Sequence, residues 1–155
     1  MLLKASFVDH FDRQFRTLDG IYPVTSDAAW SYGDPVVKGV WQWTYHVLET
    51  IDFYMGEQVE FESGKQFGVD WEETEAPDIP TQGDMKAYQD LVKQKTSSIL
   101  KNKSEADFGG KETVFTWTGD IYAGRLMYLL RHTQQHVGDI NQVLRLVKCD
   151  TLTWH

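Results

Sequence analysis

The sequence has few of the features that crosslink a chain or place it in a membrane. Its 155 residues include one cysteine, Cys149, so no disulfide can form within the chain. No apolar run approaches the roughly 20 residues that a membrane-spanning helix needs. The first residues, MLLKASFVDHFDRQF, are interrupted by charged side chains before the apolar region of a signal peptide could form. We therefore expect a soluble, cytoplasmic protein with no membrane partner.

Positive charge is also scarce. The chain has 15 Lys and Arg against 23 Asp and Glu, and its net charge is −8. A protein that binds DNA or RNA needs basic side chains gathered on one face to contact phosphates, and no run of Lys and Arg occurs here. Nucleic acid is therefore not expected as a partner.

Aromatic residues, in contrast, are abundant. They make up 14% of the chain, so aromatic rings should form much of the core and of any pocket. The length is sufficient for one compact domain with its own core and short for two. No internal repeat or low-complexity tract interrupts it. We expect a single domain over residues 1–155.

Four segments show the periodicity of amphipathic helices, with apolar residues every three or four positions. The predicted helices cover residues 2–18, 35–55, 81–101 and 119–148. Asp34 can cap the second helix, with Pro35 in its first turn and Gly56 at its end. Residues 113–117 are β-prone but too few to form a sheet. The pattern predicts an all-α fold, an up-down four-helix bundle.

The connection between the second and third predicted helices, residues 57–80, has no helical periodicity. Its acidic residues include Glu60, Glu62, Asp70, Glu72, Glu73, Glu75 and Asp78. A connection this long inside a compact domain is usually functional or mobile. Because it also contains Phe61, Phe67 and Trp71, we expect an ordered flap that packs against the helices.

Two of the five histidines, His132 and His136, lie four residues apart on the last predicted helix. Their stripe of the helix also carries Leu129, Ile140, Val143 and Val147. The two rings therefore point to the side where the core is expected. They are offset by about 40° around the helix axis and about 6 Å along it, so both can reach one point. Pairs of this spacing recur in metal sites.

A third histidine, His46, lies in the middle of the second predicted helix. It shares a face with Gly39, Trp43, Thr50 and Phe53, and helices that are not consecutive can still meet across a bundle. Three neutral imidazoles can hold a divalent cation at about 2.0–2.1 Å each and leave positions open for water or substrate. The alternative is a metal-free cluster of hydrogen-bonded core histidines. The other two histidines lie outside this pattern.

Further residues are candidates for supporting roles around the three histidines. Groups that accept the second ring N–H of a ligating histidine orient its imidazole. The candidates are Glu49 for His46, Gln135 for His132 and Asp139 for His136, although each could instead lie on a solvated face. Trp43 shares the face of His46 and is the candidate pocket residue. No Ser-His-Asp pattern, phosphate-binding glycine loop or reactive-cysteine motif is apparent.

The stretches WTYHVLE and RHTQQHVGDI resemble the DinB-like superfamily, also called the DinB/YfiT-like metalloenzymes. Members of that superfamily have one histidine in the second helix and an i, i+4 pair in the last. The second histidine of their pair is typically followed by x-Gly-x-[Ile/Leu], which HVGDI at residues 136–140 fits. The resemblance extends to helix count, helix order and loop placement over nearly the whole chain.

This resemblance implies a four-helix bundle of the DinB/YfiT-like type that binds a divalent metal, Zn or Ni, through His46, His132 and His136. It also implies a homodimer. Relatives include thiol S-transferases that use bacillithiol or mycothiol, a thiol-dependent isomerase, and members without a known activity. The sequence does not identify the catalytic residues of this chain.

Two functions are compatible with such a site. An ion with an open position lowers the pKa of a bound water or thiol, which supports thiol transfer to a small electrophile or hydrolysis of a small molecule. Alternatively, the protein is a stress-related bundle that binds a metal or a small ligand without catalysis. A fourth protein ligand that closes the metal shell would favour the second function.

Overall fold

The computed structural model describes residues 2–34, 36–72 and 78–155. Its elements are α1 (Leu3–Asp19), α2 (Ile21–Val24), α3 (Asp27–Trp30), α4 (Val40–Tyr54), α5 (Gln82–Asn102), α6 (Glu105–Phe108), the 3₁₀ helix η1 (Thr116–Thr118) and α7 (Tyr122–Leu146). Within these ranges no strand forms, and only an isolated bridge joins Lys111 to Ile121. The predicted all-α class is confirmed.

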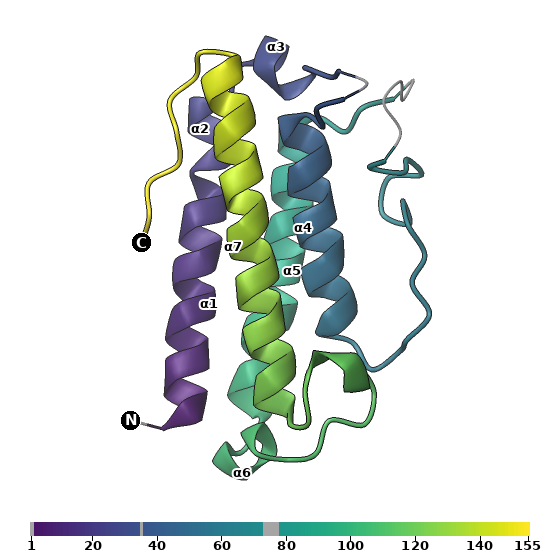
Figure 1. The fold of residues 1–155 in the computed structure, drawn as a ribbon, viewed down its shortest axis with the longest axis vertical. Helices are drawn as coiled ribbons and strands as arrows, with labels where there is room; N and C mark the ends of the chain where they lie inside the picture. The colour runs from purple at the N-terminus through teal and green to yellow at the C-terminus, as the bar shows by residue number, and fades with distance from the viewer. Residues whose placement is uncertain (1, 35, 73–77) are drawn as a thin grey trace.

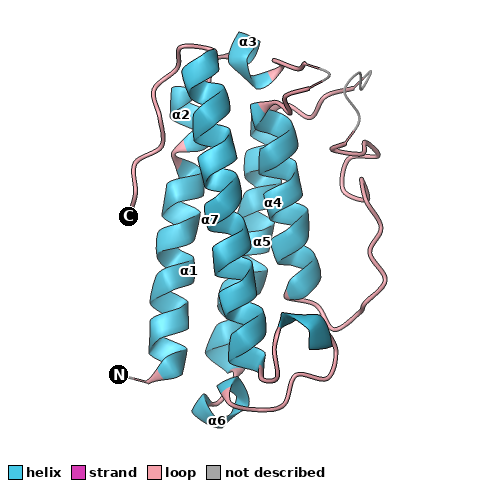
Figure 2. Ribbon diagram, viewed as in Figure 1, coloured by secondary structure: helices cyan, strands magenta, loops and turns pink. Residues whose placement is uncertain are grey.

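The four long helices lie side by side, as Figures 1 and 2 show. Helix α4 packs mainly against α7 and α5, and α1 packs against the same two helices from the other side. The short helices α2 and α3 lie at one end of this arrangement and α6 lies at the other (Figure 1). The long helices correspond to the four segments with helical periodicity, and their packing places α4 directly beside α7.

The direction of α5 differs from the strict alternation of an up-down bundle. In Figure 1, α1 and α7 run upward, whereas α4 and α5 both run downward. The described part of the connection, residues 57–72, follows the outer side of α4 back towards the end where α4 begins. This long return lets α5 start beside the start of α4, so the two helices run parallel.

Helix α4 begins at Val40, five residues later than predicted. Asp34 Oδ1 accepts hydrogen bonds from the N–H groups of Val36 and Val37, at 2.8 and 3.3 Å, and so closes a local turn instead of capping the helix. The predicted role of Pro35 falls on a position outside the described residues.

A close backbone approach at Gly39 sets the actual start of α4. A Cβ atom at this position would lie 2.0 Å from the carbonyl oxygen of Tyr32, so only glycine fits. The N–H of Gly39 donates to Gln42 Oε1 at 2.7 Å, which pairs a backbone donor at the helix N-terminus. The start of this helix therefore depends on a tertiary contact.

The remaining boundaries lie close to the predicted ones. Helix α5 begins after Thr81, whose hydroxyl accepts a hydrogen bond from the N–H of Asp84 at 3.1 Å. Residues 116–118 form η1, so the β-prone run is in part helical. None of the helices in the described ranges is both long and apolar enough to cross a membrane.

The core fills the space between the four long helices. From α1 it receives Phe7, Phe11, Phe15 and Leu18. From α7 it receives Leu126, Leu129, Val137, Ile140, Val143 and Leu144. His136 lies among these apolar side chains of α7 and is itself buried.

Candidate metal centre

Helices α4 and α7 bring the three histidines together, as the sequence predicted. His46 Nε2 lies 3.2 Å from His132 Nε2, which in turn lies 3.2 Å from His136 Nε2. One ring nitrogen from each residue lies within 4.8 Å of the other two, and the group could hold a metal ion. The convergence follows from the packing of α4 against α7 and from the one-turn separation of the pair on α7.

Hydrogen bonds alone cannot satisfy this arrangement. His136 Nδ1 lies 2.8 Å from Asp139 Oδ2, and because a carboxylate only accepts, Nδ1 carries the proton and Nε2 presents a lone pair. His132 Nε2 faces two other Nε2 atoms. A neutral ring nitrogen has either one N–H or one lone pair, so His132 Nε2 can form one good hydrogen bond and not two. One of the two contacts is left unpaired.

The other nitrogen of His132 adds to this deficit. His132 Nδ1 is buried and has no hydrogen-bond partner among the described residues. A buried polar atom without a partner is uncommon in folded proteins. An ion bound at Nε2 would leave Nδ1 unpaired as well, so the preference for metal binding over a hydrogen-bonded core cluster rests on the Nε2 contacts.

The spacing of the nitrogens fits a divalent ion. Donors held at about 2.0–2.1 Å in tetrahedral geometry lie about 3.3 Å apart, close to the 3.2 Å separations found here. In the described part of the chain, no Asp, Glu, Cys or further His joins the three as a donor. Three protein ligands are typical of sites that keep a position for water or substrate, whereas structural zinc sites usually have four.

Electrostatics keep two of the rings in the form that binds metals. Burial lowers the pKa of His46 to about 3, and the neighbouring His132 and His136 contribute to the shift. Burial also lowers the pKa of His132 to about 4, with a further contribution from His136. Both rings are thus neutral at pH 7, and a neutral imidazole nitrogen is what a divalent ion binds.

Aromatic side chains of the two helices enclose the cluster. Trp43, the candidate pocket residue on α4, stacks on His136 with ring centroids 4.7 Å apart and an interplanar angle of 20°. Tyr128, one turn before His132 on α7, lies parallel to that ring at 6.1 Å. Both aromatic residues cover faces of the imidazoles and reduce their contact with water.

The third aromatic neighbour, Trp71, comes from the acidic connection. The centroid of its ring lies 4.1 Å from the centroid of the His46 ring. Its backbone carbonyl accepts a hydrogen bond from Gln42 Nε2 at 2.9 Å. Lys38 Nζ lies 5.8 Å from the centre of the Trp71 ring and donates to the carbonyl of Glu72. The sequence predicted that this ring packs but gave no indication that it packs on a histidine.

The connection also packs through its two phenylalanines, as predicted. Phe61 contacts Phe53 of α4, and Phe67 lies between Tyr45 and Tyr88. The predicted acidic positions Glu73 and Glu75 lie outside the described residues.

The three candidate supporting residues have different environments. Asp139 contacts His136, as described above. Glu49 lies elsewhere, because its Oε1 accepts the N–H of Gly64 at 2.9 Å on the α5 side of α4. Gln135 is exposed on α7. A residue three positions from a histidine is about 60° away around the helix, so tertiary packing decides whether it faces the cluster.

The cluster is thus a group of three imidazoles with converging nitrogens, one carboxylate partner and an aromatic enclosure. No protein-family model, curated protein or solved structure shows a significant match to this chain.

Proposed function

We propose that this chain is a divalent-metal protein of the DinB-like type, a four-helix bundle in which His46, His132 and His136 bind one Zn²⁺ or Ni²⁺. The observation that carries the proposal is the convergence of three Nε2 atoms, which hydrogen bonding alone leaves unsatisfied. A divalent ion accepts a lone pair from each ring and removes that deficit.

The residues around the histidines have separate tasks in this proposal. Asp139 keeps the proton of His136 on Nδ1, so that the lone pair of Nε2 points into the cluster. Trp43, Tyr128 and Trp71 limit the access of water and provide apolar surface beside the open position. A divalent ion held by three imidazoles supplies a Lewis acid that lowers the pKa of a coordinated water or thiol.

The activity that these features support best is metal-dependent thiol transfer to a small electrophile or hydrolysis of a small molecule. The three-donor shell favours catalysis over a closed structural site. In the described chain no fourth protein donor occupies the remaining position, so a substrate or a thiol can take it.

Metal analysis of the purified protein tests the site. We expect one divalent ion per wild-type chain and none in the His132→Ala/His136→Ala variant. A matched control, His10→Ala/His155→Ala, removes two exposed histidines outside the cluster and should retain the ion. Equal metal content in all three proteins would refute the site.

The activity is tested separately. Protein loaded with Zn²⁺ or Ni²⁺ is assayed with pairs of a low-molecular-weight thiol and an electrophile, and with simple esters. Turnover that disappears in His132→Ala/His136→Ala supports catalysis at the cluster. If the loaded wild-type protein has no turnover with either substrate class, the site binds metal without this chemistry.

A further inference from the structure

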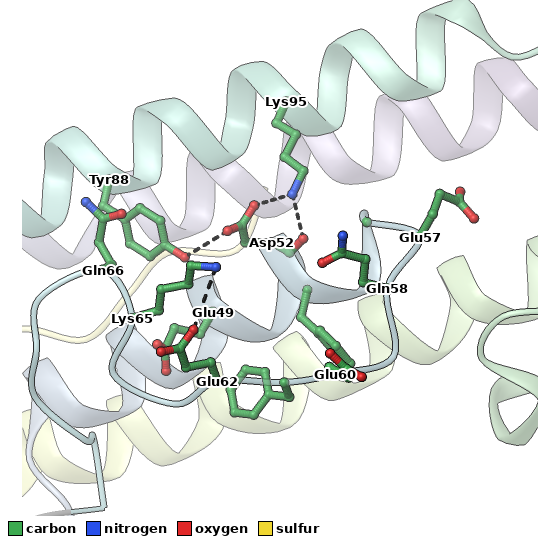
Figure 3. A pocket seen from close by; sticks show the side chains of 13 residues that line it. Glu49, Asp52, Glu57, Gln58, Glu60, Glu62, Lys65, Gln66, Tyr88 and Lys95 are labelled. Carbon is green, nitrogen blue, oxygen red and sulfur yellow. Dashed lines mark hydrogen bonds and ion pairs between the residues drawn. The ribbon is translucent and has the colours of Figure 1, made fainter.

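Hydrogen bonds to its backbone hold the connection between α4 and α5 against α4. The hydroxyl of Tyr45 accepts the N–H groups of Gln66 and Phe67 at 3.2 and 3.4 Å, and Glu49 Oε1 accepts the N–H of Gly64 at 2.9 Å. Figure 3 shows Glu49 and Gln66 around a cavity of about 810 Å³ on the side of α4 that faces α5. None of the three histidines lines this cavity, so it does not lead to the candidate metal centre.

The connection is attached to α4 a second time at Trp71, on the side of the histidines. The backbone carbonyl of Trp71 accepts a hydrogen bond from Gln42 Nε2 at 2.9 Å, and the carbonyl of Glu72 accepts one from Lys38 Nζ. Both bonds hold the backbone and neither involves the indole ring, which is half-buried. Rotation of the Trp71 side chain can therefore move the ring while the connection stays in place.

The Trp71 ring lies close to the space that a ligand of the metal would occupy. Its centroid is 4.1 Å from that of His46, the shortest of the three contacts between an imidazole and its aromatic cover. A nitrogen that binds an ion at 2.0–2.1 Å places that ion about 3 Å from the centre of its imidazole ring. An ion at the cluster therefore lies within about 7 Å of the centre of the Trp71 ring.

The other two aromatic covers are held more firmly. Trp43 belongs to α4 and stacks on His136, and Tyr128 belongs to α7 and also packs on Tyr54, with ring centroids 5.1 Å apart. The backbone of a helix restricts the rotamers of its side chains. Trp71 lies outside the helices. Of these three rings, it is the one that can move without disturbing a helix.

We propose that Trp71 is a movable cover of the histidine cluster that sets the size of the molecule able to reach the open coordination position. With the ring over His46, a ligand as small as water enters. A ligand with a bulky group enters only after the ring has rotated away. The selection of ligands rests on the proposed metal function, whereas the covering of His46 does not.

Carbethoxylation of the metal-free protein with diethyl pyrocarbonate tests the cover. Mass spectrometry of proteolytic fragments measures the reaction of each histidine separately. Trp71→Ala should speed the modification of His46 about tenfold, the effect expected from the loss of one aromatic contact. Trp71→Phe keeps a ring and should react like the wild type, and the exposed His10 should react equally in all three proteins. Equal modification of His46 in Trp71→Ala and the wild type would overturn the proposal.

Protein loaded with Co²⁺ tests the selection by size. The thiols 2-mercaptoethanol and benzyl mercaptan bind cobalt through the same kind of sulfur and differ in bulk, and the sulfur-to-cobalt absorption measures their association rates. Trp71→Ala should speed the association of benzyl mercaptan about tenfold and that of 2-mercaptoethanol less than about twofold. Trp154→Ala removes a tryptophan that is 58% exposed and should change neither rate. Equal acceleration of both thiols in Trp71→Ala would overturn the selection by size.

The two measurements separate a failure of the cover from a failure of the metal site. If the wild type binds Co²⁺ but His46 reacts equally with and without the Trp71 ring, the cover is wrong and the metal site stands. If Trp71 protects His46 but the wild type binds no Co²⁺, the metal site and the selection of its ligands are both wrong. Thermal melting verifies that each variant is folded. Trp71→Leu, which keeps an apolar side chain but exposes part of the imidazole face, takes the place of Trp71→Ala if the latter does not fold.

Discussion

Arg125 and Glu112 form a buried ion pair whose charges are well matched. The three histidines between α4 and α7, of which His136 is buried and the other two are partly buried, instead have unmatched nitrogens. Arg125 Nε and Nη2 donate to the two oxygens of Glu112, each at 2.6 Å. Arg125 Nη1 also donates to the carbonyls of Tyr54 and Gly56, which pairs acceptors at the end of α4. The residues of this pair are both 3% exposed.

Hydrogen-bond donors around Glu112 also stabilise its ionised carboxylate. Burial tends to raise its pKa, but the hydrogen bonds from Arg125 and from the N–H groups of Phe115 and Val114 outweigh burial and lower the pKa to about 2. At the histidine cluster, the two contacts of His132 Nε2 have no such compensation. A satisfied buried cluster stabilises the fold, whereas an unsatisfied one indicates a ligand-binding site.

The largest effect is expected from breaking the matched pair. Glu112→Ala leaves the Arg125 guanidinium buried without its counter-charge and should lower the free energy of unfolding by about 3–5 kcal/mol. Urea denaturation at pH 7 measures the loss. The exposed pair of Arg13 and Asp9, with side chains 47% and 54% exposed, provides the control.

Arg13→Ala should cost less than about 1 kcal/mol, because solvent screens an exposed pair. If Glu112→Ala and Arg13→Ala lower the free energy of unfolding equally, the buried pair does not stabilise the fold more than an exposed pair does.

The second prediction concerns the unmatched cluster. Zn²⁺ at a free concentration one hundred times its Kd should raise the free energy of unfolding of the wild-type protein by about 2.7 kcal/mol. Thermal or urea unfolding with and without the ion measures the gain. His132→Ala/His136→Ala should gain nothing and His10→Ala/His155→Ala should gain as much as the wild type. Equal stabilisation of all three proteins would mean that the ion binds elsewhere.

Asp139→Asn tests the hydrogen bond between His136 Nδ1 and Asp139. The substitution removes the negative charge that holds the proton on His136 Nδ1, and affinity for Zn²⁺ should fall about 10- to 100-fold. Competition with a chelating dye measures the affinity. Asp150→Asn, an exposed position, should leave it unchanged. An unchanged affinity in Asp139→Asn would show that the carboxylate does not orient the ring.

Much of the candidate site could be predicted from the sequence, because helical periodicity alone determines its geometry within a helix. The i, i+4 spacing placed His132 and His136 on one face, and the apolar stripe identified that face as buried. His46 followed from its position in the middle of a second amphipathic helix. These inferences needed only the period of the helix and the tendency of apolar faces to meet.

Features that depend on contacts between distant segments could not be predicted. The start of α4 depends on the approach of Tyr32 to Gly39, and the side on which Trp71 packs depends on the path of the connection. Glu49 illustrates the same limit. Its spacing from His46 was compatible with a contact, but the carboxylate pairs with Gly64 from the connection instead.

The last prediction compares Glu49 directly with Glu112. Both glutamates are buried, at 5% and 3% exposure, but only Glu112 has an arginine partner. Burial raises the pKa of Glu49 to about 7, against the opposing effects of the Tyr45 hydroxyl and the Gly64 N–H. Because the value in the unfolded chain is about 4.5, the folded state holds more protons between these two pH values.

The stability that Glu49 contributes is therefore present at low pH and is lost as the pH rises from about 4.5 through about 7. Glu49→Gln keeps the acceptor for Gly64 and removes the ionisation, so it should be more stable than the wild type at pH 8, by about 1.4 kcal/mol for each unit of pKa shift realised. At pH 4.5 the two proteins should differ little. Glu112→Gln should be less stable than the wild type at pH 8, because its carboxylate is the charged partner of Arg125. Thermal melting of the wild type, Glu49→Gln and Glu112→Gln at both pH values measures this contrast. If Glu49→Gln melts below the wild type at pH 8, the ionised Glu49 carboxylate is stabilised by other groups of the folded chain, which contradicts the prediction.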